Sequence, residues 1–170
     1  MQRFAFGKLQ FEEAVFGRNY EKEGIVLTPE SRVIKVHIPR TGTRLDCDSL
    51  KESYKKAKEF FVNEPMVFVC SSWLLYPRNK EILSSHSNLF AFMNDYEIIE
   101  YGCYEDYTNV WRLFDMHYNG DVEQLPQNTS LRRAYADWIR KGEKVGWGFG
   151  VYVYKEKEEG NYEDERANNR

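Results

Sequence analysis

The sequence is poor in the residues that build metal centres and disulfide frameworks. Its 3 cysteines, Cys47, Cys70 and Cys103, lie far apart, and no CxxC pair occurs. This spacing argues against a cysteine zinc site and against a set of structural disulfides. The 3 histidines are also scattered, without the spacing of metal ligands. We therefore expect no metal cofactor.

Long apolar runs and an excess of positive charge are missing as well. No apolar run approaches the roughly 18 residues of a membrane-spanning helix, and residues 1–15 lack the apolar core of a signal peptide. The formal net charge of −3 does not supply the basic surface that nucleic-acid binding requires. We expect a cytoplasmic protein that binds neither membranes nor nucleic acids.

Aromatic residues, in contrast, are abundant: 12 Tyr, 11 Phe and 4 Trp make up 16% of the 170 residues. They could form an aromatic-rich core with aromatic edge strands, or line a groove that stacks against a ring or sugar. The length suits one domain, which we place at residues 1–154. The charged segment at 155–170, KEKEEGNYEDERANNR, is expected to be a disordered tail.

Apolar patterning gives the order of the elements. Alternating or continuous apolar segments predict strands at 4–16, 32–39, 66–75, 96–102, 107–114 and 145–154. An apolar stripe at Leu50, Tyr54, Ala57 and Phe60 predicts a helix of about four turns, with Asp46 as its N-cap.

A second apolar stripe at 131–139 predicts another helix, which Asn128 or Thr129 caps and Gly142 ends. Short helical pieces are expected at 78–83 and 87–94. The segment 32–72 should form a right-handed β-α-β crossover. The fold class is therefore mixed α/β (α+β), with a mostly antiparallel central sheet, one parallel crossover and helices on its faces.

Seven short motifs occur in an order that suggests a family. They are GKLQFE (7–12), VHIP (36–39), AKEFF (57–61), CSSWLL (70–75), SN (87–88), LPQNTSLRRA (125–134) and GWGFG (146–150). Together they resemble the C-terminal, GNAT-like domain of bacterial acyltransferase domain-containing proteins. The resemblance implies an N-acetyltransferase-like sheet that splays open to admit acyl-CoA, and a companion N-terminal domain in the fuller members of the family.

The loop after the strand at 32–39 is the first candidate for cofactor binding. In the GNAT pattern, the loop between the central strand and its helix holds the pyrophosphate through backbone N–H groups. The equivalent stretch here is Arg40, Thr41, Gly42, Thr43 and Arg44, which has the position of that loop but not its motif. Asp46, as an N-cap, would occupy the N–H groups that a phosphate needs. The loop can therefore be a phosphate cradle or a capped turn.

The candidates for chemistry follow the two parallel strands. His37 and Cys70 both lie near the carboxyl ends of these strands, where open α/β sheets bind ligands. His37 is a candidate general base for an acceptor amine, and Cys70 with His37 is a candidate nucleophilic pair. The resemblance implies that Tyr76 could be the acid for the leaving thiolate. Ser71 and Ser72 could hydrogen-bond a ligand between the strands.

These residues support three hypotheses. The first is an acyl-CoA-dependent N-acyltransferase that passes an acyl group from acetyl-CoA or another acyl-CoA to an unknown amine acceptor. The second is a non-catalytic module that binds a ligand or a partner, and that has lost the pyrophosphate loop or needs a second domain or a homo-oligomer to complete its site. The third is a Cys–His hydrolase or transferase.

Overall fold

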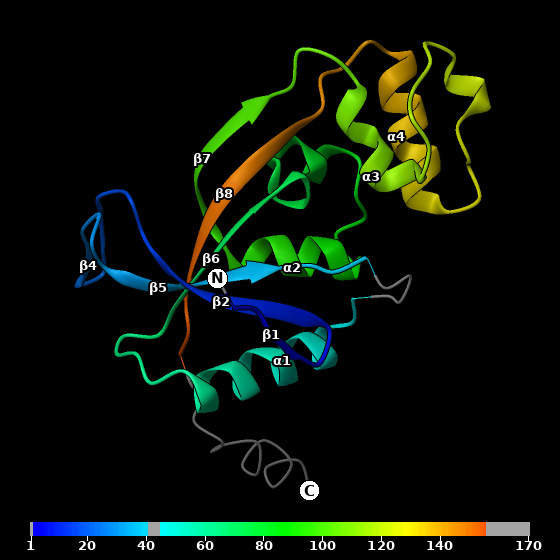
Figure 1. Cartoon of the computed structure of the whole chain (residues 1–170). Coiled ribbons are helices and arrows are strands. Elements are labelled where there is room, and N and C mark those ends of the chain that lie inside the picture. Colours follow the sequence, from blue (N-terminus) through cyan, green and yellow to red (C-terminus); the bar gives the residue numbers. More distant parts are fainter. Residues whose placement is uncertain (1, 41–44, 156–170) are drawn as a thin grey trace, which may run out of the picture.

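The computed structural model describes residues 2–40 and 45–155, and its centre is a six-stranded mixed sheet. The strand order is β1-β2-β5-β6-β8-β7, and β3 pairs with β4 in a separate hairpin (Figure 1). The strands are β1 (Phe4–Phe6), β2 (Leu9–Val15), β3 (Tyr20–Lys22), β4 (Ile25–Leu27), β5 (Arg32–His37), β6 (Val67–Ser72), β7 (Glu97–Cys103) and β8 (Gly146–Val153). Only β5 and β6 are parallel, so the predicted mixed, mostly antiparallel sheet with one parallel crossover is confirmed.

The helices lie on one face of the sheet and in a lobe at its end (Figure 1). They are α1 (Cys47–Phe60), α2 (Asn88–Asp95), α3 (Trp111–Phe114) and α4 (Ser130–Arg140). Short 3₁₀ helices occur at η1 (Trp73–Leu75), η2 (Pro77–Glu81), η3 (Thr108–Val110) and η4 (Val122–Gln124). None of the helices in this described part of the chain is long and apolar enough to cross a membrane.

Alternation along the strands gives the sheet two different faces. One face packs against α1 and α2 through a core that includes Phe11, Ile34, Phe68, Tyr54 and Phe92. The opposite face carries a smaller apolar cluster, in which Phe16 and Leu27 from the β3–β4 hairpin region cover Val33, Val69 and Phe149. Because side chains alternate, Gln10, Glu12, Lys35 and His37 also belong to this second face.

The alternating glycines of β8 allow the backbone after β6 to lie against the sheet. A Cβ on Gly148 would lie 2.2 Å from the carbonyl oxygen of Leu75, and one on Gly150 would lie 2.8 Å from the Cβ of Tyr96. The backbone of Leu75 and the side chain of Tyr96 therefore occupy the space that the glycines of β8 leave free. This packing also brings Trp73 and Leu74 close to the carboxyl end of β6.

Two expectations from the sequence need correction. The segment 107–114 forms η3 and α3 instead of a strand, because Val110 and Phe114 are spaced by one helical turn and both pack into the core of the lobe. The segment 4–16 is not one strand but the hairpin β1–β2, which turns at Gly7 with a φ of 60°. The predicted tail, apart from Lys155, lies outside the described residues.

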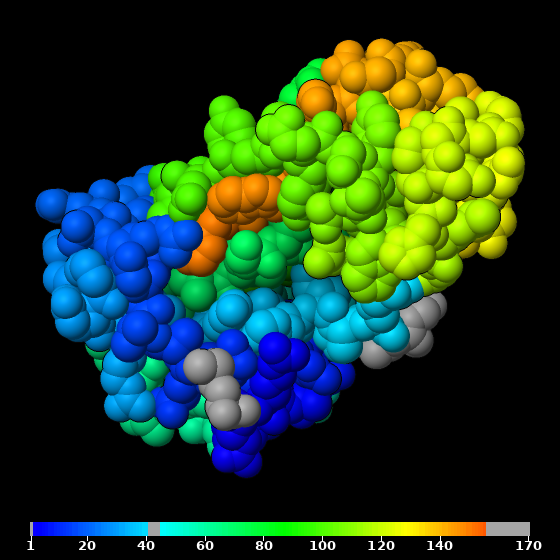
Figure 2. All heavy atoms as spheres, turned by 45° about the horizontal axis from the view of Figure 1, so that its top comes forward, coloured from blue at the N-terminus to red at the C-terminus, as the bar shows by residue number. Residues whose placement is uncertain are grey.

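The lobe consists of residues 104–145, between β7 and β8, and has its own apolar core. Val110, Phe114, Tyr135, Trp138 and Ile139 are among its buried residues. In Figure 2 the yellow-green lobe stands directly beside the light-blue atoms of β5, although the two are far apart in sequence. The carboxyl ends of the parallel strands therefore face the lobe.

Candidate functional site

The site begins where the two parallel strands part. Register pairs join β5 and β6 only at Ile34–Phe68 and Lys35–Val69, although each strand has 6 residues. Beyond these pairs lies a cavity of about 520 Å³, lined by Val36 to Arg40 from the β5 side and Cys70 to Leu74 from the β6 side. The two strands therefore splay apart, as the resemblance implied, and the cavity lies where they separate.

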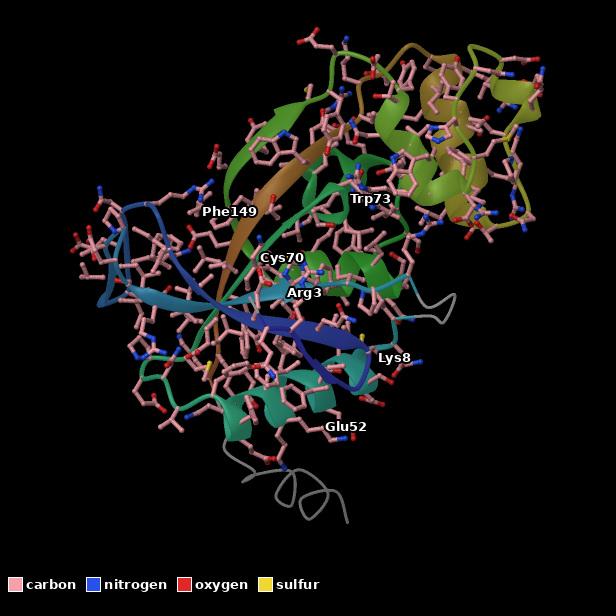
Figure 3. All side chains as sticks on the ribbon, viewed as in Figure 1. Arg3, Lys8, Glu52, Cys70, Trp73 and Phe149 are labelled. Carbon is pink, nitrogen blue, oxygen red and sulfur yellow. The ribbon has the colours of Figure 1, made fainter. Side chains whose placement is uncertain are left out.

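Segments remote in sequence complete the walls of this cavity. Arg3 and Gln10 come from the β1–β2 region, Tyr104 and Arg112 from the lobe, and Trp147 from β8. Figure 3 shows Arg3 and Cys70 at the centre of the sheet, with Trp73 nearer to the lobe, and all three line the cavity.

Positive charge dominates the wall. Arg3, Arg40 and Arg112 line the cavity, and no Asp or Glu does so among the described residues. Two guanidinium groups lie over the Trp111 ring, with its centroid 5.2 Å from Cζ of Arg40 and 5.1 Å from Cζ of Arg112. A wall of arginines and indole rings suits an anion attached to an apolar or aromatic group.

Asp115, a residue of the lobe, connects Arg40 of this wall with Arg132. Its carboxylate pairs with Arg40 and lies 2.7 Å from Arg132 Nη2, while its backbone has a positive φ of 58°. Arg132 also donates to the carbonyl of Leu113 at 3.0 Å. Arg40 is therefore held against the lobe at the wall of the cavity.

His37 lies in the cavity wall beside a buried carboxylate. Its Nε2 is 3.1 Å from Oε1 of Glu12, although its N–H direction is not aimed at that oxygen. Glu12 is only 4% exposed. Burial acts to raise the pKa of Glu12, but contacts with His37 and Arg3 and the charge of Lys35 outweigh it, so this pKa lies below its usual value. The carboxylate is therefore ionised at neutral pH.

Cys70 shares the cavity with His37 but does not form a pair with it. The parallel register sets Val36 level with Cys70 and His37 level with Ser71, so the thiol and the imidazole belong to opposite faces of the sheet. The two side chains share no hydrogen bond in the described structure. Burial raises the pKa of the Cys70 thiol to about 12, which keeps it protonated at neutral pH.

Ser71 and Ser72 both line the cavity, as the sequence suggested, but Tyr76 does not. The Ser72 Oγ accepts a hydrogen bond from the backbone N–H of Leu74 at 3.1 Å and so caps η1. The Tyr76 side chain is 2% exposed, and its hydroxyl lies 3.2 Å from the Cys103 thiol. Burial and this contact raise the pKa of Tyr76 to about 12.

The loop that follows β5 is described only in part. Arg40 lines the cavity, whereas Thr41, Gly42, Thr43 and Arg44 lie outside the described residues. Asp46 does cap α1: its carboxylate accepts from Ser49 N at 2.9 Å and from Ser49 Oγ at 2.7 Å. One of the N–H groups at the start of α1 is therefore already occupied.

The sequence did not reveal several residues of this site. Arg3, Tyr104, Trp111 and Arg112 carried no motif, and the last two lay in a segment predicted as a strand. Gln10 and Glu12 lie in the motif GKLQFE, but nothing in the sequence assigned them to the site. The alternation of β2, with Leu9 and Phe11 on the helix face, could have placed Glu12 on the same face as His37 once the β2–β5 pairing was known.

Comparisons with known proteins agree with this fold. The chain matches the family model of the GNAT-like C-terminal domain over residues 4–152. Its fold is similar to that of the crystal structure of an acyltransferase in complex with decanoyl-CoA, with a TM-score of 0.71 and 23% identity. A second acyltransferase structure, in complex with decanoyl-CoA and teicoplanin, gives a TM-score of 0.70 and the same 23% identity.

The chain spans about half the length of these two structures. The first alignment covers 90% of this chain and 46% of the other, and the second covers 89% and 47%. No curated protein matches the chain. At this level of identity the likeness to the two structures establishes the fold. Because the family model covers nearly all of the described residues, the chain belongs to the GNAT-like C-terminal domain family.

Proposed function

We propose that the chain binds acyl-CoA at the splay between β5 and β6, and that the protein is an acyl-CoA-dependent N-acyltransferase. The observation that carries this proposal is the cavity of about 520 Å³ at the splay, with three arginines and no carboxylate among its described lining residues. Further support comes from the two acyltransferases of similar fold, whose structures contain decanoyl-CoA.

The lining of the cavity combines charged and apolar side chains. Arg40 and Arg112 beside Trp111 can neutralise phosphate oxygens and stack against a planar group. Val36, Ile38 and Leu74 supply apolar walls between the strands. An elongated donor with a charged head and an uncharged thioester end matches this combination.

His37 is the proposed general base for the transfer. The acceptor amine attacks the thioester carbonyl carbon, a C–N bond forms, and the C–S bond breaks to release the CoA thiolate. The nitrogen gives up one proton in this step, and the His37 imidazole in the cavity wall can accept it. The thiolate then takes up a proton and leaves as CoA.

Tyr76 and Cys70 have no role in this proposal. The Tyr76 hydroxyl is turned toward Cys103 and lies outside the cavity lining, so it cannot reach a thioester between the strands without repacking. Cys70 faces the core on the α1 side, and its raised pKa disfavours the thiolate that a nucleophile requires.

A non-catalytic binding module remains the second candidate. It is favoured by the Asp46 cap, which occupies an N–H group of α1 that a pyrophosphate would use in the GNAT pattern. Under this alternative the cavity binds its anionic ligand but no acyl group is transferred.

Calorimetric titration tests whether the cavity at the splay binds acyl-CoA, as both candidate functions require. We expect the chain to bind decanoyl-CoA and acetyl-CoA saturably, and Arg40→Ala or Arg112→Ala to lower the affinity about tenfold, because each removes a charged hydrogen-bond donor. The matched control is Arg32→Ala, which removes an exposed arginine paired with Glu13 at the opposite end of β5.

Two outcomes decide the matter. If no acyl-CoA binds at millimolar concentration, or if all three arginine variants bind alike, the cavity is not the donor site. If acyl-CoA binds and His37→Ala removes transfer to an amine while leaving this binding intact, the N-acyltransferase is supported over the binding module.

A further inference from the structure

Glu12 is a buried carboxylate that the proposed reaction does not yet use. It lies on β2 opposite Lys35, and Gln10 on the same strand lies opposite His37. Since residues two apart share a face, Glu12 and His37 are diagonal neighbours on the second face of the sheet. Glu12 is only 4% exposed.

Three cationic or ionisable side chains surround Glu12. Arg3 Nε lies 3.2 Å from Oε2, Lys35 Nζ lies 3.7 Å from Oε1, and His37 Nε2 lies 3.1 Å from Oε1. The side chains of Arg3 and Lys35 are 55% and 43% exposed, so water also solvates their charges. The His37 side chain is only 21% exposed, so it depends more than they do on protein groups for its polar contacts.

The Nε2 atom of His37 is enclosed beside Glu12. Nε2 is closed off from solvent, and Glu12 Oε1 is the polar atom within hydrogen-bonding distance of it in the described structure. An ionised carboxylate can only accept hydrogen bonds, so an unprotonated Nε2 would place its lone pair beside a negative charge. A neutral His37 is therefore most stable with its proton on Nε2 and its lone pair on Nδ1.

We propose that Glu12 is a positioning residue, which holds the His37 ring with Nε2–H toward Oε1 and leaves Nδ1 as the atom that accepts the proton of the acceptor amine. The catalytic part of this inference rests on the proposed function, whereas the tautomer is a property of the resting protein. Closing the angle between Nε2–H and Oε1 requires a rotation of the ring, and catalytic hydrogen bonds often tighten in this way when substrate binds.

Other ionisable groups line the cavity or lie beside Glu12, and Cys70 among them belongs to the opposite face of the sheet. Arg3 comes from the segment before β1, Lys35 and Arg40 from β5 and its extension, Cys70 from β6, and Tyr104 and Arg112 from the lobe. Glu12 is the only carboxylate within reach of the ring among the described residues.

Nitrogen NMR of the full chain tests the tautomer directly. With ¹⁵N-labelled histidine in alkaline buffer, we expect His37 of the unmodified protein to be almost entirely the Nε2–H form. Glu12→Gln keeps the size of the side chain but can donate as well as accept, so His37 should become a mixture of both forms. Glu12→Ala removes the acceptor and should give a mixture too.

Glu13→Gln is the matched control, because Glu13 neighbours Glu12 in β2 but is exposed and pairs with Arg32. It should leave the tautomer unchanged. The signal of His37 is assigned through its loss in His37→Gln. A proton on Nδ1 in the unmodified protein would overturn the proposal, and so would an unchanged tautomer in a folded Glu12→Gln or Glu12→Ala variant.

Kinetics test the catalytic part. Glu12→Gln should lower kcat about tenfold, less than the roughly hundredfold or larger loss expected for His37→Ala, and leave the KM for acyl-CoA unchanged. Glu12→Gln with full kcat would refute a positioning role. If no acceptor amine is ever acylated, the proposed function fails, but the tautomer experiment still decides whether Glu12 positions His37.

Discussion

Three free cysteines occupy three different environments, and these environments set their reactivity. Cys70 is buried in the wall of the cavity, Cys47 is half-buried at the start of α1, and Cys103 is exposed at the end of β7. Only the thiolate is a strong nucleophile, and burial raises the pKa of Cys70 to about 12. Its thiolate fraction therefore stays very small until the pH approaches that value.

We expect iodoacetamide at pH 8 to label Cys103 first and Cys70 last. Peptide mass spectrometry of the native protein should find Cys70 unmodified when Cys103 is fully labelled, and unfolding in urea should remove the difference. Cys70→Ala should retain acyl transfer. Rapid labelling of Cys70, or loss of transfer in a folded Cys70→Ala, would instead support the Cys–His hypothesis.

The start of α1 is an element whose role can be tested separately from the cavity. Asp46→Ala should lower the melting temperature, because Ser49 N loses its hydrogen-bond acceptor. It should not raise the affinity for acyl-CoA if arginines hold the phosphates. A gain in affinity would show that Asp46 blocks a phosphate site at the helix N-terminus.

The effect of this cap depends on pH. Hydrogen bonds from the side chain and backbone of Ser49 hold the pKa of Asp46 below its usual value. A lowered pKa means that the stabilisation is present above the unfolded-state pKa of about 3.9 and is lost as the pH falls through the folded-state pKa. The difference in melting temperature between the unmodified protein and Asp46→Ala should therefore shrink below about pH 4. Asp48→Ala, which removes an exposed carboxylate of the same turn, is the control.

Elements with strong local signals could be predicted from the sequence. The apolar stripe and caps of α1 and α4 gave both helices, with Asp46 and Thr129 as their N-caps and Gly142 with a positive φ of 71° after α4. The segment 107–114 could not be predicted in this way, because its aromatic and β-branched residues favour a strand, while packing within the lobe makes it helical.

At the scale of the whole molecule, a buried hydrogen-bond network joins the lobe to the sheet. The Tyr135 hydroxyl of α4 donates to Oδ1 of Asn79, and Nδ2 of Asn79 donates to the carbonyl of Trp73 at 2.8 Å. Asn79 is 2% exposed, and the Trp73 ring lies edge-on to Tyr135 at 5.7 Å. The lobe therefore fixes the backbone of η1, which lines the cavity.

Tyr135→Phe should destabilise the protein by about 1–3 kcal/mol, because Asn79 Oδ1 loses its donor in a buried environment. Urea denaturation gives the change in the free energy of unfolding. We also expect weaker acyl-CoA binding, since η1 loses part of its support. Tyr118→Phe, in the same lobe, is the control, and equal stability of the two variants would contradict this role of the network.

Of the candidate site, the sequence could predict only the residues that come from the two neighbouring parallel strands and their ends. His37, Arg40, Cys70, Ser71 and Ser72 follow from a single rule about the carboxyl ends of parallel strands, and all five line the cavity. Arg3 and Arg112 reach it from the β1 edge and from the lobe. No local pattern encodes these approaches, since they depend on how distant segments pack.

The lobe leaves the sheet and returns to it at one point. Cys103 pairs with Gly146, and the N–H of Tyr104 donates to the carbonyl of Val145 at 2.8 Å, so residues 104–145 are a single insertion between two hydrogen-bonded strands. A segment with adjacent ends can be replaced during evolution without moving the strands that carry His37. Because it also supplies Tyr104, Trp111 and Arg112, we expect its exchange to change which ligands the cavity accepts, while β5 and β6 stay the same. The sheet can thus be inherited while the lobe diversifies.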